Sequence, residues 1–279
     1  MGECGLTDIS WLQKLCNLKN LSLQNNKKIS QLEIPFTFNS IERLNLSYCS
    51  FKQISFIKAF VNLKELFLSE NYGVEITPLK NLTQLIKLEL QYCGLNSINA
   101  LIPLVNLKEL NLSKNKKLND ITALQHLTKL TNIYLAECCL EDIIVLQELI
   151  NLKQLDLTFN FIIYADSLKN LTNLQQLQIQ SNLIQDFSAI MNHPNFNRYI
   201  ISDQEIPTDN QKSFAYKMKC VDDQILLLRQ IQKYRPRQKI AVCMEQVSNS
   251  LNKYFKSAVS FVLQIQALFE LESRVQSWQ

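Results

Sequence analysis

One leucine pattern, repeated along most of the chain, restricts the fold more than any other feature. The motif LxxLxL, with Leu, Ile, Phe or Tyr at its apolar positions, begins at residues 18, 41, 63, 85, 107, 130, 152, 174 and 196, so its starts are 22 or 23 residues apart. Apolar positions 4 and 6 alternate with polar ones, as in a strand with one buried face. Because one unit cannot bury its own leucines, neighbouring units must stack into a solenoid.

The second half of each unit carries apolar residues at every third position, as Leu95, Ile98, Leu101 and Leu104 do in the fourth unit. This spacing suits an extended segment or a 3₁₀ turn. Strands of successive units would then lie about 4.8 Å apart in one parallel sheet. We predict an α/β solenoid that curves into an arc, with the parallel sheet on its concave side.

The pattern resembles the leucine-rich repeat family, and specifically its short 22-residue type, which is known from internalins and from a regulatory subunit of protein phosphatase 1. The resemblance covers about residues 4–205 and rests on eight consecutive matching units. It implies a horseshoe or arc whose concave face recognises other molecules. It also suggests, by analogy of fold alone, a regulatory or targeting subunit of a protein phosphatase.

Position 9 of the units alternates between two residue types. The chain turns sharply there, and its buried backbone groups need partners. Asn offers both a donor and an acceptor, and Cys offers a weak S–H donor. We therefore predict a structural ladder of side chains in which the cysteines are reduced and buried, with a Cys138–Cys139 redox pair as the alternative. The ladder consists of Cys4, Asn26, Cys49, Asn71, Cys93, Asn115, Cys138, Asn160 and Asn182.

We predict that the solenoid spans residues 1–205, with a partial repeat at 1–17, full repeats at 18–195 and a terminal strand at 196–205. The partial repeat either marks a fragment of a longer repeat protein or acts with Trp11 as a cap. Residues 206–279 change in composition, and their apolar residues step alternately by three and four on both sides of Pro236. This pattern predicts a C-terminal helical hairpin or coiled coil, which either self-associates or folds onto the last unit.

Several classes of function are disfavoured by composition. Only four glycines are present, and they form neither phosphate-binding loop. His126 and His193 are the only histidines. We therefore predict no enzymatic activity, no metal and no cofactor. No signal peptide or run of 18 apolar residues is evident, so we expect a cytoplasmic protein without a membrane span.

The side chains between the leucines should face the concave side, which makes them candidates for binding a partner protein. Exposed aromatic rings surrounded by charges are typical of interaction hot spots, although such rings also pair simply across a sheet. We interpret the chain as a non-catalytic protein–protein interaction scaffold. The predicted partner-binding residues are Tyr48, Phe67, Glu70, Glu89, Tyr92, Lys114, Tyr134, Glu137, Asp156 and Phe159.

A basic cluster near Pro236 supports a different function. It has no acidic residue between its members, and its net charge suits an acidic partner or nucleic acid. A solvated hinge is the alternative interpretation. The cluster consists of Arg229, Lys233, Arg235, Arg237 and Lys239.

Overall fold

The computed structural model describes residues 5, 6, 9, 12, 14–29, 34, 36–182, 184, 188–191 and 193. The chain divides into two units, Met1–Glu205 and Ile206–Gln279, and every described residue belongs to the first. The predicted terminal strand, helical hairpin and basic cluster lie outside the described residues, as do Cys4 and Trp11. They stay predictions, as does the boundary at residue 205.

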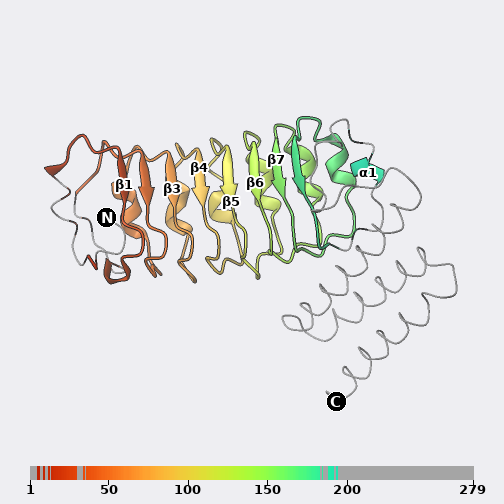
Figure 1. Cartoon of the computed structure of the whole chain (residues 1–279). Coiled ribbons are helices and arrows are strands. Elements are labelled where there is room, and N and C mark those ends of the chain that lie inside the picture. Colours follow the sequence, from red (N-terminus) through yellow and green to blue (C-terminus); the bar gives the residue numbers. More distant parts are fainter. Residues whose placement is uncertain are drawn as a thin grey trace, which may run out of the picture. The chain divides into compact units, whose positions relative to one another are not determined.

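Eight short strands form one parallel sheet in chain order, with no crossover. Figure 1 shows them side by side along the described part of the chain. They are β1 (Asn20–Ser22), β2 (Arg43–Asn45), β3 (Glu65–Phe67), β4 (Lys87–Glu89), β5 (Glu109–Asn111), β6 (Asn132–Tyr134), β7 (Gln154–Asp156) and β8 (Gln176–Gln178). Each strand holds positions 3 to 5 of one LxxLxL motif, so the predicted repeat is confirmed.

The register of the sheet follows the repeat. Leu44 pairs with Leu66, Leu66 with Leu88 and Leu88 with Leu110, and this alignment runs from β1 to β8. Each of these four leucines is completely buried, because position 4 points into the interior of every unit. Stacking therefore places equivalent side chains at equivalent places in neighbouring units.

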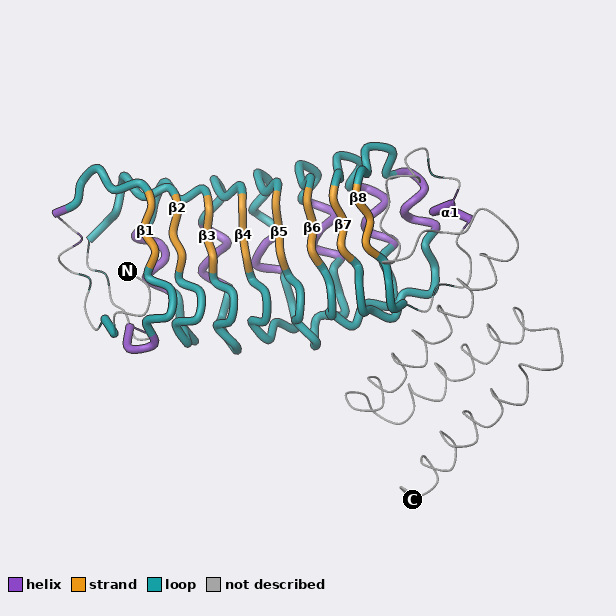
Figure 2. The backbone as a smooth tube through the Cα atoms, in the orientation of Figure 1, coloured by secondary structure: helices purple, strands orange, loops and turns teal. Residues whose placement is uncertain are grey.

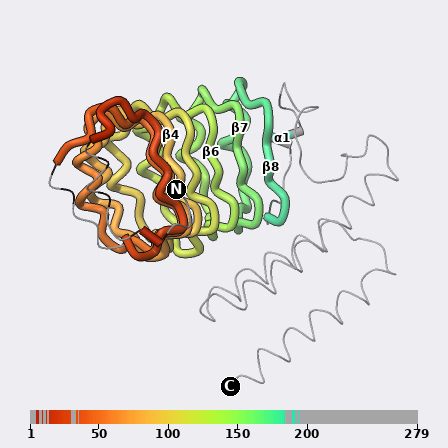
Figure 3. The backbone as a smooth tube through the Cα atoms, turned by 60° about the vertical axis from the view of Figure 1, so that its left-hand side comes forward, coloured from red at the N-terminus to blue at the C-terminus, as the bar shows by residue number. Residues whose placement is uncertain are grey.

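The opposite wall consists mainly of 3₁₀ helices, which confirms the 3₁₀ turns predicted from the three-residue spacing. Figure 2 shows these helices behind the strands, and Figure 3 shows successive units lying one behind another. They are η2 (Lys27–Ile29), η3 (Ser55–Ala59), η4 (Thr77–Asn81), η5 (Asn99–Leu101), η6 (Thr122–His126), η7 (Ile144–Glu148) and η8 (Asp166–Asn170), and one short α-helix follows, α1 (Ser188–Met191).

The position-9 asparagines connect neighbouring units through buried hydrogen bonds. The side-chain oxygen of Asn115 accepts from the N–H groups of Cys93 and Leu95, both at 3.0 Å. Its amide nitrogen donates to the carbonyl oxygens of Leu90 at 2.9 Å and Leu112 at 2.6 Å. These bonds satisfy backbone groups that the sharp turn would otherwise leave without partners. The same four bonds recur at Asn71 and Asn160.

The three position-9 cysteines that the structure describes are buried free thiols, as the ladder predicts. Each S–H donates to the position-6 carbonyl oxygen of the preceding unit, at 3.1 to 3.3 Å. The three pairs are Cys49 with Leu23, Cys93 with Leu68 and Cys138 with Leu112.

Burial should protect these thiols from alkylation. Loss of hydration raises the pKa of both Cys93 and Cys138 to about 12, so almost no thiolate forms near neutral pH. When the folded protein is treated with iodoacetamide at pH 8, we expect modification of the exposed Cys16 and none of Cys93 or Cys138. Peptide mapping by mass spectrometry measures this, and denatured protein is the control. Rapid labelling of Cys93 in folded protein would contradict the ladder.

His193 occupies a position that leucine fills in the preceding units. It follows Leu171 by 22 residues, is buried, and has Nε2 3.0 Å from the Leu171 carbonyl oxygen. Burial lowers the pKa of His193, although its hydrogen bond to Leu171 opposes this effect in part.

The free energy of unfolding should therefore depend on pH near this histidine. Since the folded-state pKa is lowered, the neutral form is favoured by folding, and the unfolded chain binds the proton first as pH falls below about 6.5. We expect stability to decrease from pH 8 to pH 5, and H193L to weaken that decrease. Urea denaturation at both pH values tests this, and an unchanged pH dependence in H193L would contradict it.

Candidate interaction surface

The outward side chains of the sheet form one continuous surface, called here the sheet face. It consists of positions 3, 5, 7 and 8 of the eight repeats that begin at residues 18 to 174. Positions 3 and 5 lie on the strands, and position 8 lies at the turn that follows each strand. The sheet face carries three cations and six carboxylates, so its net charge is negative: Arg43, Lys87 and Lys114 against Glu65, Glu70, Glu89, Glu109, Glu137 and Asp156.

Every position-8 residue adopts a left-handed backbone conformation. Their φ angles run from 54° to 64° at Asn25, Tyr48, Glu70, Tyr92, Lys114, Glu137, Phe159 and Ser181. This conformation is unfavourable for residues with a Cβ atom, and most of all for bulky ones. Backbone bonds between units hold it, such as the N–H of Tyr48 donating to the Ser69 carbonyl oxygen at 3.0 Å. The residue types at position 8 did not indicate it, because none is glycine.

Position 3 forms a row of alternating charges across four neighbouring strands. Arg43, Glu65, Lys87 and Glu109 are consecutive in the register. Arg43 lies 2.9 Å from Glu65, and Lys87 contacts Glu109 and lies 3.4 Å from Glu89. Burial alone would lower the pKa of Lys87, but its hydrogen bonds to and charge interactions with both glutamates outweigh burial and raise that pKa. The sequence analysis missed Arg43 and Lys87, although their 22-residue spacing from the glutamates was readable.

Phe67 lies between two of these cations. The Arg43 guanidinium carbon is 4.6 Å from its ring centroid, and the Lys87 ammonium nitrogen is 5.6 Å from it. These distances are those of cation–π interactions. The ring is half-buried as a result.

Other predicted residues have partners within the chain. The Tyr134 hydroxyl donates to the side-chain oxygen of Gln154 at 3.0 Å. Asp156 accepts the Thr158 N–H at 2.9 Å, and Glu137 lies 3.8 Å from Lys116. Asp156 thus has a structural role that the asparagines at position 5 repeat in other units, Asn45 and Asn111.

The five predicted aromatic residues do not form one cluster. Phe67 and Tyr134 lie on β3 and β6, whereas Tyr48, Tyr92 and Phe159 lie at the turns after β2, β4 and β7. Among the described residues no ring of this group packs on another member of it. Tyr92 instead contacts Tyr72, with ring centroids 5.7 Å apart. Tyr72 was not among the predicted residues.

Comparison with solved structures finds repeat proteins of the same architecture. A leucine-rich repeat protein of Leptospira interrogans is 22% identical, covers 78% of this chain and has a TM-score of 0.59. At that identity, the similarity shows the fold. This chain has the leucine-rich repeat fold. Internalin C2 of Listeria monocytogenes is 33% identical over 52% of the chain, with a TM-score of 0.49. The chain spans 63% of the length of each of these two proteins.

Two further comparisons found nothing: no protein-family model matches the chain, and neither does any curated protein. The assignment to the leucine-rich repeat fold therefore rests on the repeat, the register of the sheet and the solved structure of the Leptospira protein.

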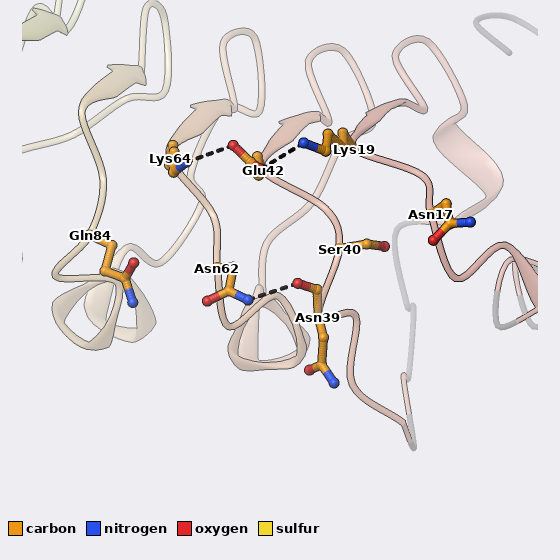
Figure 4. Close-up of a pocket in the computed structure, with 8 residues that line it drawn as sticks. All are labelled: Asn17, Lys19, Asn39, Ser40, Glu42, Asn62, Lys64 and Gln84. Atoms are coloured by element: carbon orange, nitrogen blue, oxygen red, sulfur yellow. Dashed lines mark hydrogen bonds and ion pairs between the residues drawn. The ribbon is translucent and has the colours of Figure 1, made fainter.

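A polar groove lies where the chain enters β1 to β4 of the leucine-rich repeat sheet. It has a volume of about 530 Å³. Figure 4 shows Glu42 between Lys19 and Lys64, at 3.6 and 2.7 Å, and Asn62 donating to the Asn39 carbonyl oxygen at 2.7 Å. Hydrogen bonding and charge from Lys64 are the main reasons that the pKa of Glu42 is lowered.

The bond from Asn62 belongs to a second ladder of asparagines, one residue before the motif, which the sequence analysis missed. Its other members donate to the carbonyl oxygens of Thr83, Thr128 and Ile150, each at 2.9 Å. They are Asn106, Asn151 and Asn173. The Asn-Leu dipeptide that recurs before five of the eight strands was the available signal. Because the polar groups of this edge bind one another, its role is structural.

Two searches of the described residues found nothing. No group of three or more His, Cys, Asp or Glu side chains there could hold a metal ion. No helix in that part of the chain is long and apolar enough to cross a membrane.

Proposed function

We propose that this leucine-rich repeat chain is a non-catalytic scaffold that binds a partner protein on its sheet face. The observation that carries this proposal is Phe67, held between Arg43 and Lys87 at the centre of a charged row. Phenylalanine and arginine are both enriched at protein–protein interfaces relative to the rest of the surface. We propose a cytoplasmic location on the sequence evidence.

The rigidity of this face supports binding. Arg43 and Lys87 are each held by a glutamate and by the Phe67 ring, so their long side chains have lost much of their freedom before a partner arrives. Ordering such side chains at an interface costs about 0.5–1.5 kcal/mol each, and a face ordered in advance avoids that cost.

Affinity capture with two variants tests the proposal. The tagged chain is incubated with extract of its own cells, and bound proteins are quantified by mass spectrometry. F67A removes the central ring, and K87E places a carboxylate beside Glu89 and Glu109. We expect either change to reduce recovery of the specific partner about tenfold or more.

I144A is the matched control, because Ile144 is an exposed apolar residue on η7, in the opposite wall. Its partner recovery should equal that of the unmodified chain. Circular dichroism must show that all variants fold. Equal recovery with folded F67A and K87E would refute the sheet face as the binding surface. The same samples are assayed for phosphatase activity and for nucleic acid. These assays test the two alternative functions suggested by the sequence, a phosphatase subunit and a nucleic-acid binder, neither of which is favoured by a described residue.

A further inference from the structure

Three exposed tyrosines gather at the turn edge of the sheet face, after β2, β3 and β4. Tyr48, Tyr72 and Tyr92 are 48%, 52% and 42% exposed, which is more exposure than is usual for tyrosine. We call these three residues the tyrosine row. The ring contact of Tyr72 with Tyr92, and the position of all three after consecutive strands, distinguish them from single exposed aromatic residues.

The structure holds Tyr72 in a defined place within this row. Its ring lies over Gly94, where an added Cβ would come within 2.9 Å of the ring carbon Cε2. The Lys52 ammonium donates to the Tyr72 carbonyl oxygen and lies 5.9 Å from the ring centroid. Gly94 thus provides the space that lets Tyr72 reach the neighbouring unit and contact Tyr92.

The spacing of the row follows from the repeat. The N–H groups of Tyr48 and Glu70 donate to Ser69 and Gln91, at 3.0 and 2.8 Å, so position 8 keeps the register of the sheet. Tyr48 and Tyr92 are therefore two units apart, at about 9.6 Å, with Glu70 between them. A polyproline II helix advances about 9.3 Å in each turn of three residues. Equivalent faces of such a helix would meet Tyr48 and Tyr92 in succession.

We propose that the tyrosine row binds a proline-rich segment of a partner protein in the polyproline II conformation, with a basic residue directed at Glu70. Flat aromatic rings with hydroxyl groups suit proline rings and the free carbonyl groups of this helix, and the ligand loses little entropy because its conformation is already restricted. An extended β-strand fits less well, because its same-side residues recur at about 6.7 Å. This proposal rests on the proposed scaffold function and specifies one class of partner for it.

Fluorescence anisotropy with labelled nonapeptides tests the proposal on the full chain. The probe is PPPRPPPPP, and the comparison peptides are GGGRGGGGG, PPPEPPPPP and an alanine-rich helical peptide with one arginine. We expect saturable binding of the probe with a Kd of about 100 µM, and at least tenfold weaker binding of the glycine and helical peptides. E70K should reverse the preference for arginine over glutamate at the fourth peptide position.

Two tyrosine variants locate the binding site. Y72A combined with Y92A should weaken probe binding about tenfold, whereas Y164A should have no effect, because Tyr164 is 73% exposed and lies outside the row. Thermal unfolding must show that the variants fold. Equal binding of the proline and glycine peptides, no saturation of the probe by about 2 mM, or full affinity in the double variant would each overturn the proposal.

The outcome separates this inference from the scaffold function. If the probe fails to bind while F67A still loses the captured partner, the sheet face functions and the polyproline inference is wrong. If the probe binds and F67A keeps its partner, the tyrosine row is a binding site and the proposed role of Phe67 is wrong.

Discussion

Asn115→Ala is expected to lower the free energy of unfolding by about 4 kcal/mol. The change removes four buried hydrogen bonds and leaves the N–H groups of Cys93 and Leu95 and the carbonyl oxygens of Leu90 and Leu112 without that partner. Each buried polar group left unsatisfied costs about 1–3 kcal/mol, so several at one turn give an effect well above that of an average substitution. Urea denaturation followed by circular dichroism measures it.

The neighbouring cysteine provides the matched control. Cys93 is as deeply buried as Asn115, but its thiol donates only weak bonds, to the carbonyl oxygens of Leu68 and Gln91. We expect C93A to cost about 1 kcal/mol. N115C should fall between the two, because a thiol replaces the donor but not the acceptor of the amide. Similar losses in N115A and C93A would mean that the ladder of asparagines contributes nothing beyond packing.

Leu110→Ala should be the second large effect, at about 3–4 kcal/mol. Leu110 is completely buried at the centre of the sheet, and its register partners Leu88 and Ile133 lie on either side. Removing three carbon atoms there opens a cavity that the two neighbouring units cannot fill, since Leu88 and Ile133 are fixed by the register. Equilibrium unfolding in urea measures the loss.

An exposed apolar residue of the same solenoid provides the control for L110A. Ile150 is 55% exposed, so I150A should change stability by no more than about 0.5 kcal/mol. If I150A lowered the free energy of unfolding as much as L110A does, burial of the side chain would not determine the stability of this repeat.

The repeat made the interior of this protein predictable. A period of 22 or 23 residues with Leu at positions 1, 4 and 6 leaves few ways to bury the leucines, so the parallel sheet, its register and the role of Asn115 all followed from spacing. The burial of His193 and its bond to Leu171 could not be predicted, because they depend on which unit the histidine joins. The phenylalanines and tyrosines gave no comparable information, since a period alone does not show how side chains of different units orient.

The surface was less predictable for a physical reason. Outward side chains are not forced into one arrangement by burial, and their positions depend on neighbours one unit away. Arg43 and Lys87 cover Phe67, and Gly94 admits Tyr72; neither effect is visible within a single repeat. The left-handed conformation at Tyr48 and Tyr92 is likewise imposed by bonds between units, because the residue type itself disfavours it.

The alternation of Asn and Cys divides residues 41–129 into two blocks of two units, and Asn182 following Asn160 makes the next block one of three units. Three hydrogen bonds of the Asn115 side chain, two accepted and one donated, join its unit to the preceding unit, which contains Cys93. A single bond from the Cys138 thiol to Leu112 is the corresponding link across the next boundary. Tightly joined blocks therefore alternate with weaker seams. A chain pulled from one end would break at those seams and lengthen by one block at a time.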